Sequence, residues 1–499
     1  MGVCCTAEEP VNPTPKGKIG DEGRFVTTVI GRTVRKLVDF REGEGPALVW
    51  SCAFFFFLLC SYYIMRPIRD EMGVAAGVEN LAFLFTGTLI GTLAIHPIFT
   101  FLVSRLPRQK FVPYIYRFFI LNLVGFYLLF TYSTDAQAVW VARAFFVWLS
   151  IINLFLISIF WSFMSDVYRP LQAKRLFGVV AVGGTLGATL GSTITTALVG
   201  MLGPVMLLLV AAALLELAAQ SSRILDRHEG RLAQVAMAAE EEALESDADV
   251  PEETASADDG VSPEDRPADQ GQEVIGGKVL DGIRHVIKSP YLLGIAAFVG
   301  LFAVISTFLY FQVAALMEAT YPDDPAARTQ VFGARDLAVN SLTFFTQLFL
   351  TGRILRYLGV GLALAFLPIL SMIGFSILGM APVLIVAIVF EVFRRAGNFA
   401  VMRPSREVLY TVLPRTDRYK SKNFNDTFVY RLGDQLGAWT YQPLFWLGMS
   451  MASLAFLMVP VSVVWLLLAL WLGKSYRKYY AEDSAGPDTP AAKAAAEGV

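Results

Sequence analysis

Long apolar runs, separated by short polar stretches, occupy the sequence from Ala47 to Leu472. A helix needs about 20 apolar residues to cross the hydrocarbon core of a bilayer, and runs of that length recur along the chain. The pattern therefore predicts about twelve transmembrane helices. The expected spans are one that begins at Ala47 and ends in the stretch 62–71, followed by 81–103, 111–131, 139–164, 177–199, 205–221, 292–316, 337–354, 360–378, 383–401, 428–445 and 451–472.

The composition agrees with lipid as the main surroundings of the chain. Hydrophobic residues make up 55% of it and charged residues 17%, whereas soluble domains approach a quarter charged. The four cysteines have no disulfide or metal-ligand spacing, and no metal or cofactor is expected. The expected fold class is an all-α polytopic membrane protein.

Lys and Arg gather in alternate loops, which sets the expected orientation in the membrane. The side that receives the basic loops is assigned to the cytoplasm, so both termini are expected there. A bacterial inner membrane is the expected location. The basic groups on that side are Arg105, Arg108 and Lys110; Arg169, Lys174 and Arg175; Arg353 and Arg356; the loop 403–422; and Lys474, Arg477 and Lys478.

Charge and composition divide the chain into successive parts. Residues 1–46 are expected to form a cytoplasmic N-terminal segment with an amphipathic helix, and residues 47–222 an N-terminal six-helix bundle. Residues 223–288 are acidic and contain no aromatic residue, which predicts a disordered cytoplasmic linker. Residues 289–473 are expected to form a C-terminal six-helix bundle, and residues 474–499 a cytoplasmic tail.

Two short motifs recur at nearly the same offset, which indicates that the two halves arose by duplication. Gly183-Gly-Thr-Leu-Gly187-Ala returns as Gly433-Asp-Gln-Leu-Gly437-Ala, and Phe101-Leu-Val-Ser-Arg105 returns as Phe349-Leu-Thr-Gly-Arg353, at offsets of 250 and 248 residues. Two pseudo-symmetric six-helix bundles joined by a long cytoplasmic loop are typical of a major-facilitator-like architecture. The glycines permit close helix packing, either where two bundles move against each other or as ordinary membrane packing.

Charged side chains inside the expected spans are the candidate functional residues, because a charge in the middle of a membrane helix is energetically costly. The first span ends with Arg66, Arg69, Asp70 and Glu71, and Pro67 is expected to kink it there. These charges either line an internal cavity or lie beyond the hydrocarbon at the outer end of the span. Because the external loops are mostly poor in arginine, the cavity interpretation is favoured.

Arginine is also frequent in later spans, and guanidinium groups pair in a bidentate manner with carboxylates and phosphates. Some of these arginines are expected to bind an anionic solute, and others to form ion pairs that exchange between inward-open and outward-open states. The candidate solute-binding residues are Arg66, Arg69, Arg143, Arg394 and Arg431. The candidate ion-pairing or gating residues are Asp70, Glu71, Glu391 and Asp434.

Four short stretches stand out: Tyr63-Ile-Met-Arg66-Pro-Ile-Arg69-Asp70, Ala173-Lys174-Arg175-Leu-Phe, Lys420-Ser-Lys422 with Asp426, and Leu432-Gly433 with Gly437. Together they resemble the nucleotide (ATP/ADP) translocases of plastids and intracellular bacteria. The resemblance implies a major-facilitator-like exchanger in which basic residues of spans one and eleven meet nucleotide phosphates. It adds Lys422 and Asp426 to the ion-pairing or gating candidates. This sequence differs from the family at two positions where the family has Lys. Arg69 keeps the positive charge, whereas Asp434 reverses it, so a solute other than a nucleotide stays open.

The expected function is secondary active transport of an anionic solute by alternating access, with nucleotide exchange as a specific form. One alternative is a receptor or scaffold descended from a transporter, which uses the acidic linker for docking. An integral membrane enzyme is the other, but the three histidines lie far apart and no catalytic motif is present. The expected partners are membrane lipid and a small anionic solute, not nucleic acid, and the protein is expected to be monomeric.

Overall fold

The structure, a computed structural model, describes residues 44–105, 108–248, 286, 289–413, 421–422 and 424–484. The expected N-terminal amphipathic helix and most of the linker and the tail lie outside the described residues. Every regular element among the described residues is a helix. The elements are α2 (Gly45–Ala75), the 3₁₀ turn η1 (Val78–Asn80), α3 (Leu81–Arg105), α4 (Arg108–Tyr132), α5 (Asp135–Val167), α6 (Pro170–Ala248), α8 (Pro290–Thr320), α9 (Pro325–Phe349), α10 (Thr351–Met380), α11 (Leu384–Gly397), the π-helical turn η4 (Asn398–Met402), α12 (Arg403–Leu409), the π-helical turn η5 (Asn425–Val429), α14 (Tyr430–Trp446) and α15 (Met451–Ser484).

The helices account for about twelve membrane crossings. Among the described residues, eight helices are long and apolar enough to cross a membrane. One of them, Arg175–His228, contains two crossings, because Gly203 interrupts α6 with a φ of 77°. Gln172 near the start of α6 donates a hydrogen bond to the carbonyl of Leu232 at 3.4 Å, so the chain doubles back between these residues. The other expected crossings, α9, α11 and α14, contain charged side chains that lower their hydropathy.

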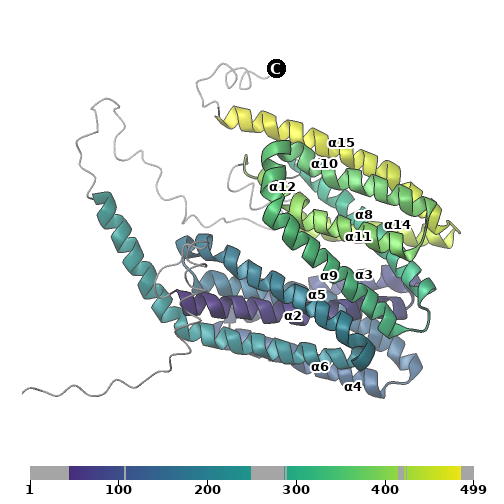
Figure 1. Ribbon diagram of the computed structural model, residues 1–499, viewed down its shortest axis with the longest axis horizontal. Coiled ribbons are helices and arrows are strands. Elements are labelled where there is room, and N and C mark those ends of the chain that lie inside the picture. The colour runs from purple at the N-terminus through teal and green to yellow at the C-terminus, as the bar shows by residue number, and fades with distance from the viewer. Residues whose placement is uncertain are drawn as a thin grey trace, which may run out of the picture.

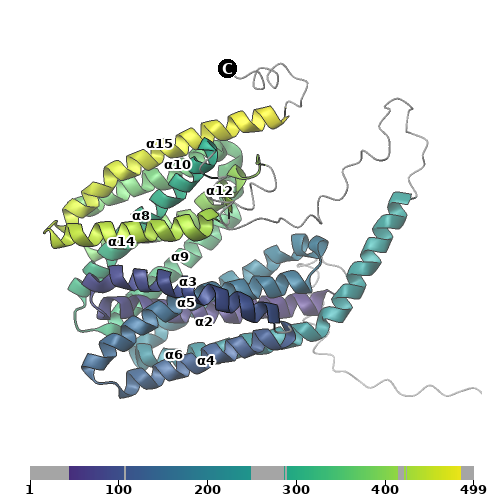
Figure 2. The ribbon, with the colours of Figure 1, turned by 180° about the vertical axis from the view of Figure 1, so that it is seen from behind.

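The crossings form two bundles that lie against each other (Figure 1 and Figure 2). The N-terminal half contains α2 to α6, and the C-terminal half contains α8 to α15. Aromatic side chains pack in the core of each half: Phe54 lies against Phe160 in the first, and Trp465 against Phe298 in the second. The protein is thus a multi-pass integral membrane protein made of two helical bundles.

The repeated glycines make the same helix contact in each half. A Cβ added at Gly183 of α6 would lie 2.8 Å from the backbone oxygen of Cys52 in α2. A Cβ added at Gly433 of α14 would likewise lie 2.8 Å from the backbone oxygen of Gly300 in α8. Both motifs therefore pack a helix against the first helix of its own half. This is ordinary membrane packing within a bundle, not a contact between the two bundles.

Helix α6 extends beyond the membrane-spanning part and corrects one expectation. The stretch from Arg223 to Ala248 was expected to be disordered, but it is helical. It contains many Ala, Leu, Glu and Arg residues, which have high helix propensity, and it contains no proline. Leu225 and Leu232 are buried and attach the start of this extension to the bundle. Residues 249–285 of the linker lie outside the described residues.

Helix α9 begins twelve residues before the expected start of the eighth span at residue 337. Its N-terminus is capped by Asp324, whose carboxylate accepts a hydrogen bond of 2.9 Å from the amide of Ala327. Arg328 and Arg335, which precede the expected span, therefore lie inside the helix and are buried. Because these residues are charged, the apolar pattern of the sequence begins only after the first turns of α9.

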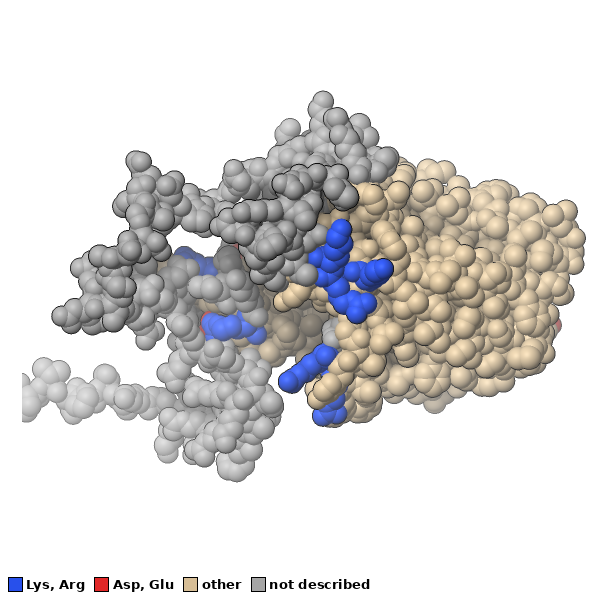
Figure 3. All heavy atoms as spheres, turned by 90° about the horizontal axis from the view of Figure 1, so that it is seen from above, with Lys and Arg blue, Asp and Glu red and all other residues tan. Residues whose placement is uncertain are grey.

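Exposed basic side chains mark one end of the bundles, called the basic end below. Arg353 and Arg356 lie there at the start of α10, and Lys474, Arg477 and Lys478 lie there near the end of α15. Figure 3 shows Lys and Arg side chains gathered at one end of the described part of the molecule, while the rest of this face has almost none. This distribution is the charge bias on which the cytoplasmic assignment of this end rests.

Candidate functional site

The two halves touch each other mainly away from the basic end. Near the start of α9, the amide of the Gln330 side chain donates a hydrogen bond of 3.1 Å to the carbonyl of Thr196 in α6. Near the end of α14, the indole N–H of Trp439 donates to the hydroxyl of Thr86 in α3 at 2.9 Å. These contacts close the end of the molecule opposite the basic end.

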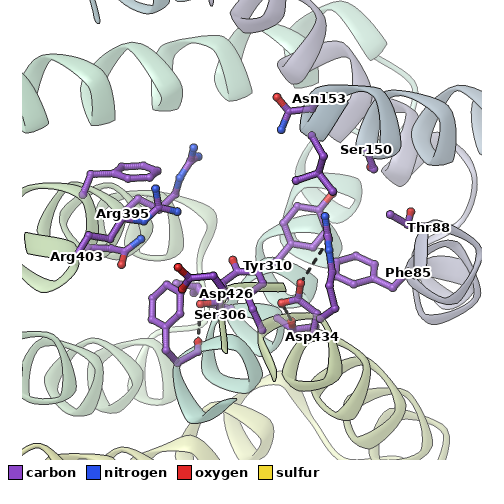
Figure 4. A pocket seen from close by; sticks show the side chains of 18 of the residues that line it. Phe85, Thr88, Ser150, Asn153, Ser306, Tyr310, Arg395, Arg403, Asp426 and Asp434 are labelled. Carbon is purple, nitrogen blue, oxygen red and sulfur yellow. Dashed lines mark hydrogen bonds and ion pairs between the residues drawn. The ribbon is translucent and has the colours of Figure 1, made fainter. Parts of the chain in front are cut away.

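A cavity of about 660 Å³ lies between the halves and extends toward the basic end. Arg69 and Tyr310 line its deep part, and Arg403 of α12 lines its mouth. Figure 4 shows Asn153 of α5 on one side of an open centre, and Arg395 and Arg403 on the other side. Both halves therefore contribute side chains to one shared cavity.

Cationic side chains outnumber anionic ones in the wall of this cavity. Among the described residues, eight Lys and Arg line it, against four Asp and Glu. An excess of one charge sign in a cleft with apolar walls attracts ions of the opposite sign. The cationic residues are Arg66, Arg69, Arg394, Arg395, Arg403, Arg406, Lys422 and Arg431, and the anionic residues are Glu391, Glu407, Asp426 and Asp434.

Arg394 of α11 is a buried cation without an ion pair among the described residues. It is 3% exposed, and its guanidinium lies 5.1 Å from the ring centre of Phe302. One terminal nitrogen donates to the hydroxyl of Ser306 at 2.6 Å and to the carbonyl of Phe302 at 3.2 Å. Its Nε has no partner in the described part of the chain. Because a guanidinium has five N–H donors, Arg394 keeps donors for a ligand in the cavity.

Arg66 and Arg69 of α2 also line the cavity, since α2 continues past both of them to Ala75. Arg66 has only a long ion pair, 3.5 Å from its Nε to a carboxylate oxygen of Asp336. Arg69 is held more tightly, with a terminal nitrogen 2.5 Å from a carboxylate oxygen of Asp70. Arg66 is therefore the freer of the two arginines.

A network of buried ion pairs behind the cavity is centred on Arg335 of α9. Its guanidinium contacts carboxylate oxygens of Asp70 at 2.5 Å, Asp336 at 3.0 Å and Glu391 at 3.4 Å. Arg395 contacts Asp336 as well, at 2.7 Å. Asp70 belongs to the N-terminal half and the others to the C-terminal half, so the network ties the halves together. Arg335 is not among the residues that the sequence pattern singles out, although a charged pair directly before an apolar run is an available clue.

A second buried ion pair joins the halves closer to the opposite end. A terminal nitrogen of Arg328 lies 2.8 Å from a carboxylate oxygen of Glu71, and the two side chains are 6% and 1% exposed. Arg328 also donates to the carbonyls of Tyr321 and Pro322 in the segment before α9. Neither Asp70 nor Glu71 is part of the cavity wall. The two acids of span one thus hold the halves together.

The remaining gating candidates lie in the cavity wall, in pairs formed within the C-terminal half. One pair is loose, whereas two are close. The loose pair is Arg431 with Asp434 at 3.7 Å, and the close pairs are Lys422 with Glu407 at 2.6 Å and Arg406 with Asp426 at 2.8 Å.

Arg143 is the solute-binding candidate that the structure places outside the cavity. Its guanidinium donates to the carbonyl of Ala76 at 3.2 and 3.4 Å and lies over the ring of Trp140. It therefore caps the end of α2 and does not line the cavity. Glu216, another charge inside a span, pairs with Arg117 at 2.8 Å and does not line the cavity either.

Comparison with known proteins gives matches among solved structures. No family model and no curated protein matches the sequence. A bacterial homologue of the human lysosomal transporter Spinster, inward-facing and unoccupied, has a TM-score of 0.52 and 11% identity, over 89% of this chain and 97% of its own. PepTSo, a POT family transporter, has a TM-score of 0.56 and 13% identity, over 87% of this chain and 98% of its own. A bacterial homologue of the iron transporter ferroportin, in an inward-facing state, has a TM-score of 0.56 and 11% identity, over 86% of this chain and 98% of its own.

The chain has a major-facilitator-like fold. At identities this low the likeness concerns the fold alone. In transporter folds built from repeats, solute sites lie near the middle of the bilayer at the interface of the repeats. The arginine-rich cavity of this major-facilitator-like chain lies at that interface.

Proposed function

We propose that this protein is a secondary transporter that carries a small anionic solute across the membrane by alternating access. The excess of cationic side chains in the wall of the cavity between the halves supports this most directly. A buried cation without a counter-charge is costly, so an anion that enters the cavity compensates it. The anion also gains charge-assisted hydrogen bonds from groups that are already in position.

Arg66, Arg394 and Arg431 are the arginines that we assign to the solute. Arg394 has no ion pair among the described residues, and the nearest carboxylate contacts of Arg66 and Arg431 are 3.5 and 3.7 Å long. Arg69 is engaged with Asp70 and contributes mainly its charge. The assigned residues come from α2, α11 and α14, so a bound anion would contact both halves.

The arrangement corresponds to an inward-facing state if the basic end lies in the cytoplasm, as the charge bias favours. The cavity extends to that end, while Arg335 with Asp70 and Arg328 with Glu71 join the halves farther from it. We assign both termini to the cytoplasm and the protein to a bacterial inner membrane. Alternating access then requires these ion pairs to separate while the halves close at the basic end.

Nucleotide exchange is the specific form that the resemblance of span one implies. The position of Arg66 and Arg69 in the cavity wall supports it, whereas Asp434 at the place of a basic residue opposes it. ADP is therefore one of the test solutes, but the solute is not assumed to be a nucleotide.

The test is a set of matched solutes applied to the purified protein. Glucose 6-phosphate is compared with glucose, ADP with adenosine, and succinate with succinamide, first by thermal shift and then by uptake into proteoliposomes. We expect an anion to raise the melting temperature and to be taken up, and its neutral partner to do neither. Equal stabilisation by the neutral partner would contradict the anion site. Binding without uptake would favour the receptor alternative.

Two arginine variants form the second arm of this test. Arg394→Lys keeps the charge but removes the planar fork, and the loss of one charge-assisted contact corresponds to about tenfold to a hundredfold weaker binding. Arg143→Lys is the matched control, because Arg143 lies outside the cavity. If both variants bind the anion with wild-type affinity, Arg394 is not a solute ligand.

A further inference from the structure

Asp434 is the buried acidic side chain with the weakest ionic partner. It is 9% exposed and lines the cavity. Its nearest cation, Arg431, is 3.7 Å away, and the hydroxyl of Thr307 donates to it at a long 3.4 Å. Every other buried acid in the described part of the chain has a closer cation. These are Glu44 at 2.9 Å, Asp70 at 2.5 Å, Glu71 at 2.8 Å, Asp336 at 2.7 Å and Glu391 at 3.4 Å.

The elements packed around Asp434 bring no second cation into contact with it. On its own helix, α14, the ionisable neighbours are Tyr430 and Arg431. From α8 only the hydroxyl of Thr307 contacts its carboxylate. Across the cavity wall, α3 contributes Phe85 and Thr88, which are uncharged. The nearby charges on other elements are engaged elsewhere: Arg394 of α11 with Ser306, and Asp426 of η5 with Arg406.

We propose that Asp434 is a proton-binding site that couples entry of the anion to uptake of a proton, an inference that rests on the proposed function. The carboxylate takes a proton from water in the cavity and becomes a neutral carboxylic acid. Arg431 then loses its acidic partner and can donate to the anion. When the cavity opens to the other side, the anion leaves, the proton returns to water, and the pair between Arg431 and Asp434 forms again.

The coupling follows from competition for one guanidinium. The carboxylate of Asp434 and the solute anion are alternative partners of Arg431. Protonation of Asp434 therefore strengthens binding of the anion. Linkage requires the reverse as well, and the bound anion strengthens proton binding at Asp434. The transported unit is thus an anion together with a proton, which reduces the charge moved through the membrane.

Infrared difference spectroscopy on the full-length protein in lipid membranes tests the proton site without knowledge of the solute. The pH is stepped between about 6 and 8, where exposed carboxylates remain ionised. We expect a carbonyl band of a protonated carboxylic acid that disappears as the pH rises. The band should be lost in Asp434→Asn and retained in Glu391→Gln, the matched variant of the next most loosely paired acid. A wild type without the band, or a band that persists in Asp434→Asn, overturns the proposal.

Thermal shift with sulfate, whose charge is constant over this pH range, tests the coupling. In the wild type we expect sulfate to bind more tightly at the lower pH, on the order of tenfold, within the usual range of coupling between two sites. In Asp434→Asn the affinity for sulfate should be the same at both pH values. An equal pH dependence in the variant overturns the coupling. Absence of any stabilisation by sulfate in the wild type would instead count against the anion site, while the infrared result still decides the proton site.

Discussion

At the scale of single residues, the positions of the buried charges are set by mutual neutralisation. Arg335 is fully buried and is shared by Asp70, Asp336 and Glu391. A buried charge is tolerated only with a partner at close distance, because desolvation costs several kcal/mol per ion, in order of magnitude. The cations that lack such a partner, above all Arg394, face the cavity. This contrast separates the arginines of the ion-pair network from those that we propose to bind the solute.

Removal of the Arg335 charge should destabilise the protein strongly. Arg335→Met leaves carboxylates of both halves without their shared guanidinium, and breaking a buried pair costs about 3 to 5 kcal/mol. The expected result is a large fall in melting temperature for detergent-purified protein. Arg356→Met, at an exposed position of the basic end, is the control and should have little effect.

A second substitution distinguishes loss of charge balance from loss of packing. Asp70→Asn combined with Arg335→Met removes one negative charge together with the positive one and so restores the net charge of the buried cluster, which should recover part of the lost stability. If the double variant is no more stable than Arg335→Met, the effect arises from packing around the side chain.

At the scale of elements, glycines decide how closely α6 approaches α2. A Cβ added at Gly187 would collide with the carbonyl oxygen of Phe56. One added at Gly200, in the same helix, would meet nothing within 4 Å. The same helix therefore contains one glycine that the packing requires and one that it does not.

This difference predicts opposite effects of one substitution at two sites. Gly187→Ala forces two backbones apart and should cost about 1 to 3 kcal/mol, as overpacking does. Gly200→Ala removes a flexible residue from a helix and should be neutral or stabilising by up to about 1 kcal/mol. Thermal unfolding followed by tryptophan fluorescence measures both. Equal melting temperatures of the two variants would show that the helices separate without strain.

At the scale of the whole molecule, the halves are joined by contacts far from the basic end, and the cavity occupies the space between them near it. The hydrogen bond between Gln330 and Thr196 belongs to the joined region. If transport works by alternating access, this region must open in each cycle. A covalent link across it should therefore stop transport and leave the cavity accessible.

Crosslinking tests this expectation directly. In a variant without native cysteines, Thr196→Cys and Gln330→Cys are joined by a short, reducible thiol crosslinker. We expect solute uptake to stop, anion binding to remain, and reduction to restore uptake. The control pair is Gln172→Cys with Leu232→Cys, which lie in contact within α6 of one half. Uptake that continues at the full rate in the crosslinked Thr196 and Gln330 variant would contradict movement of the halves at this end.

The sequence by itself determined the helical membrane fold and its duplication. Apolar runs of bilayer length leave the helix as the only way to satisfy backbone hydrogen bonds in lipid, so the crossings follow from local pattern. The repeated glycines at Gly183 and Gly433 also followed from the sequence, because a duplicated bundle repeats its closest helix contact. Most of the charged candidates were found in this way too, since a charge inside an apolar run is easily recognised.

The tertiary structure alone decided which of those charges face the cavity and which neutralise each other. Arg143 and Arg394 look alike in sequence, yet the first caps α2 and the second lines the cavity without an ion pair among the described residues. Arg335, which precedes the expected span, is the centre of the buried network. The reason is physical: the role of a buried charge depends on what lies within a few ångströms of it, and those neighbours come from helices far away in the sequence.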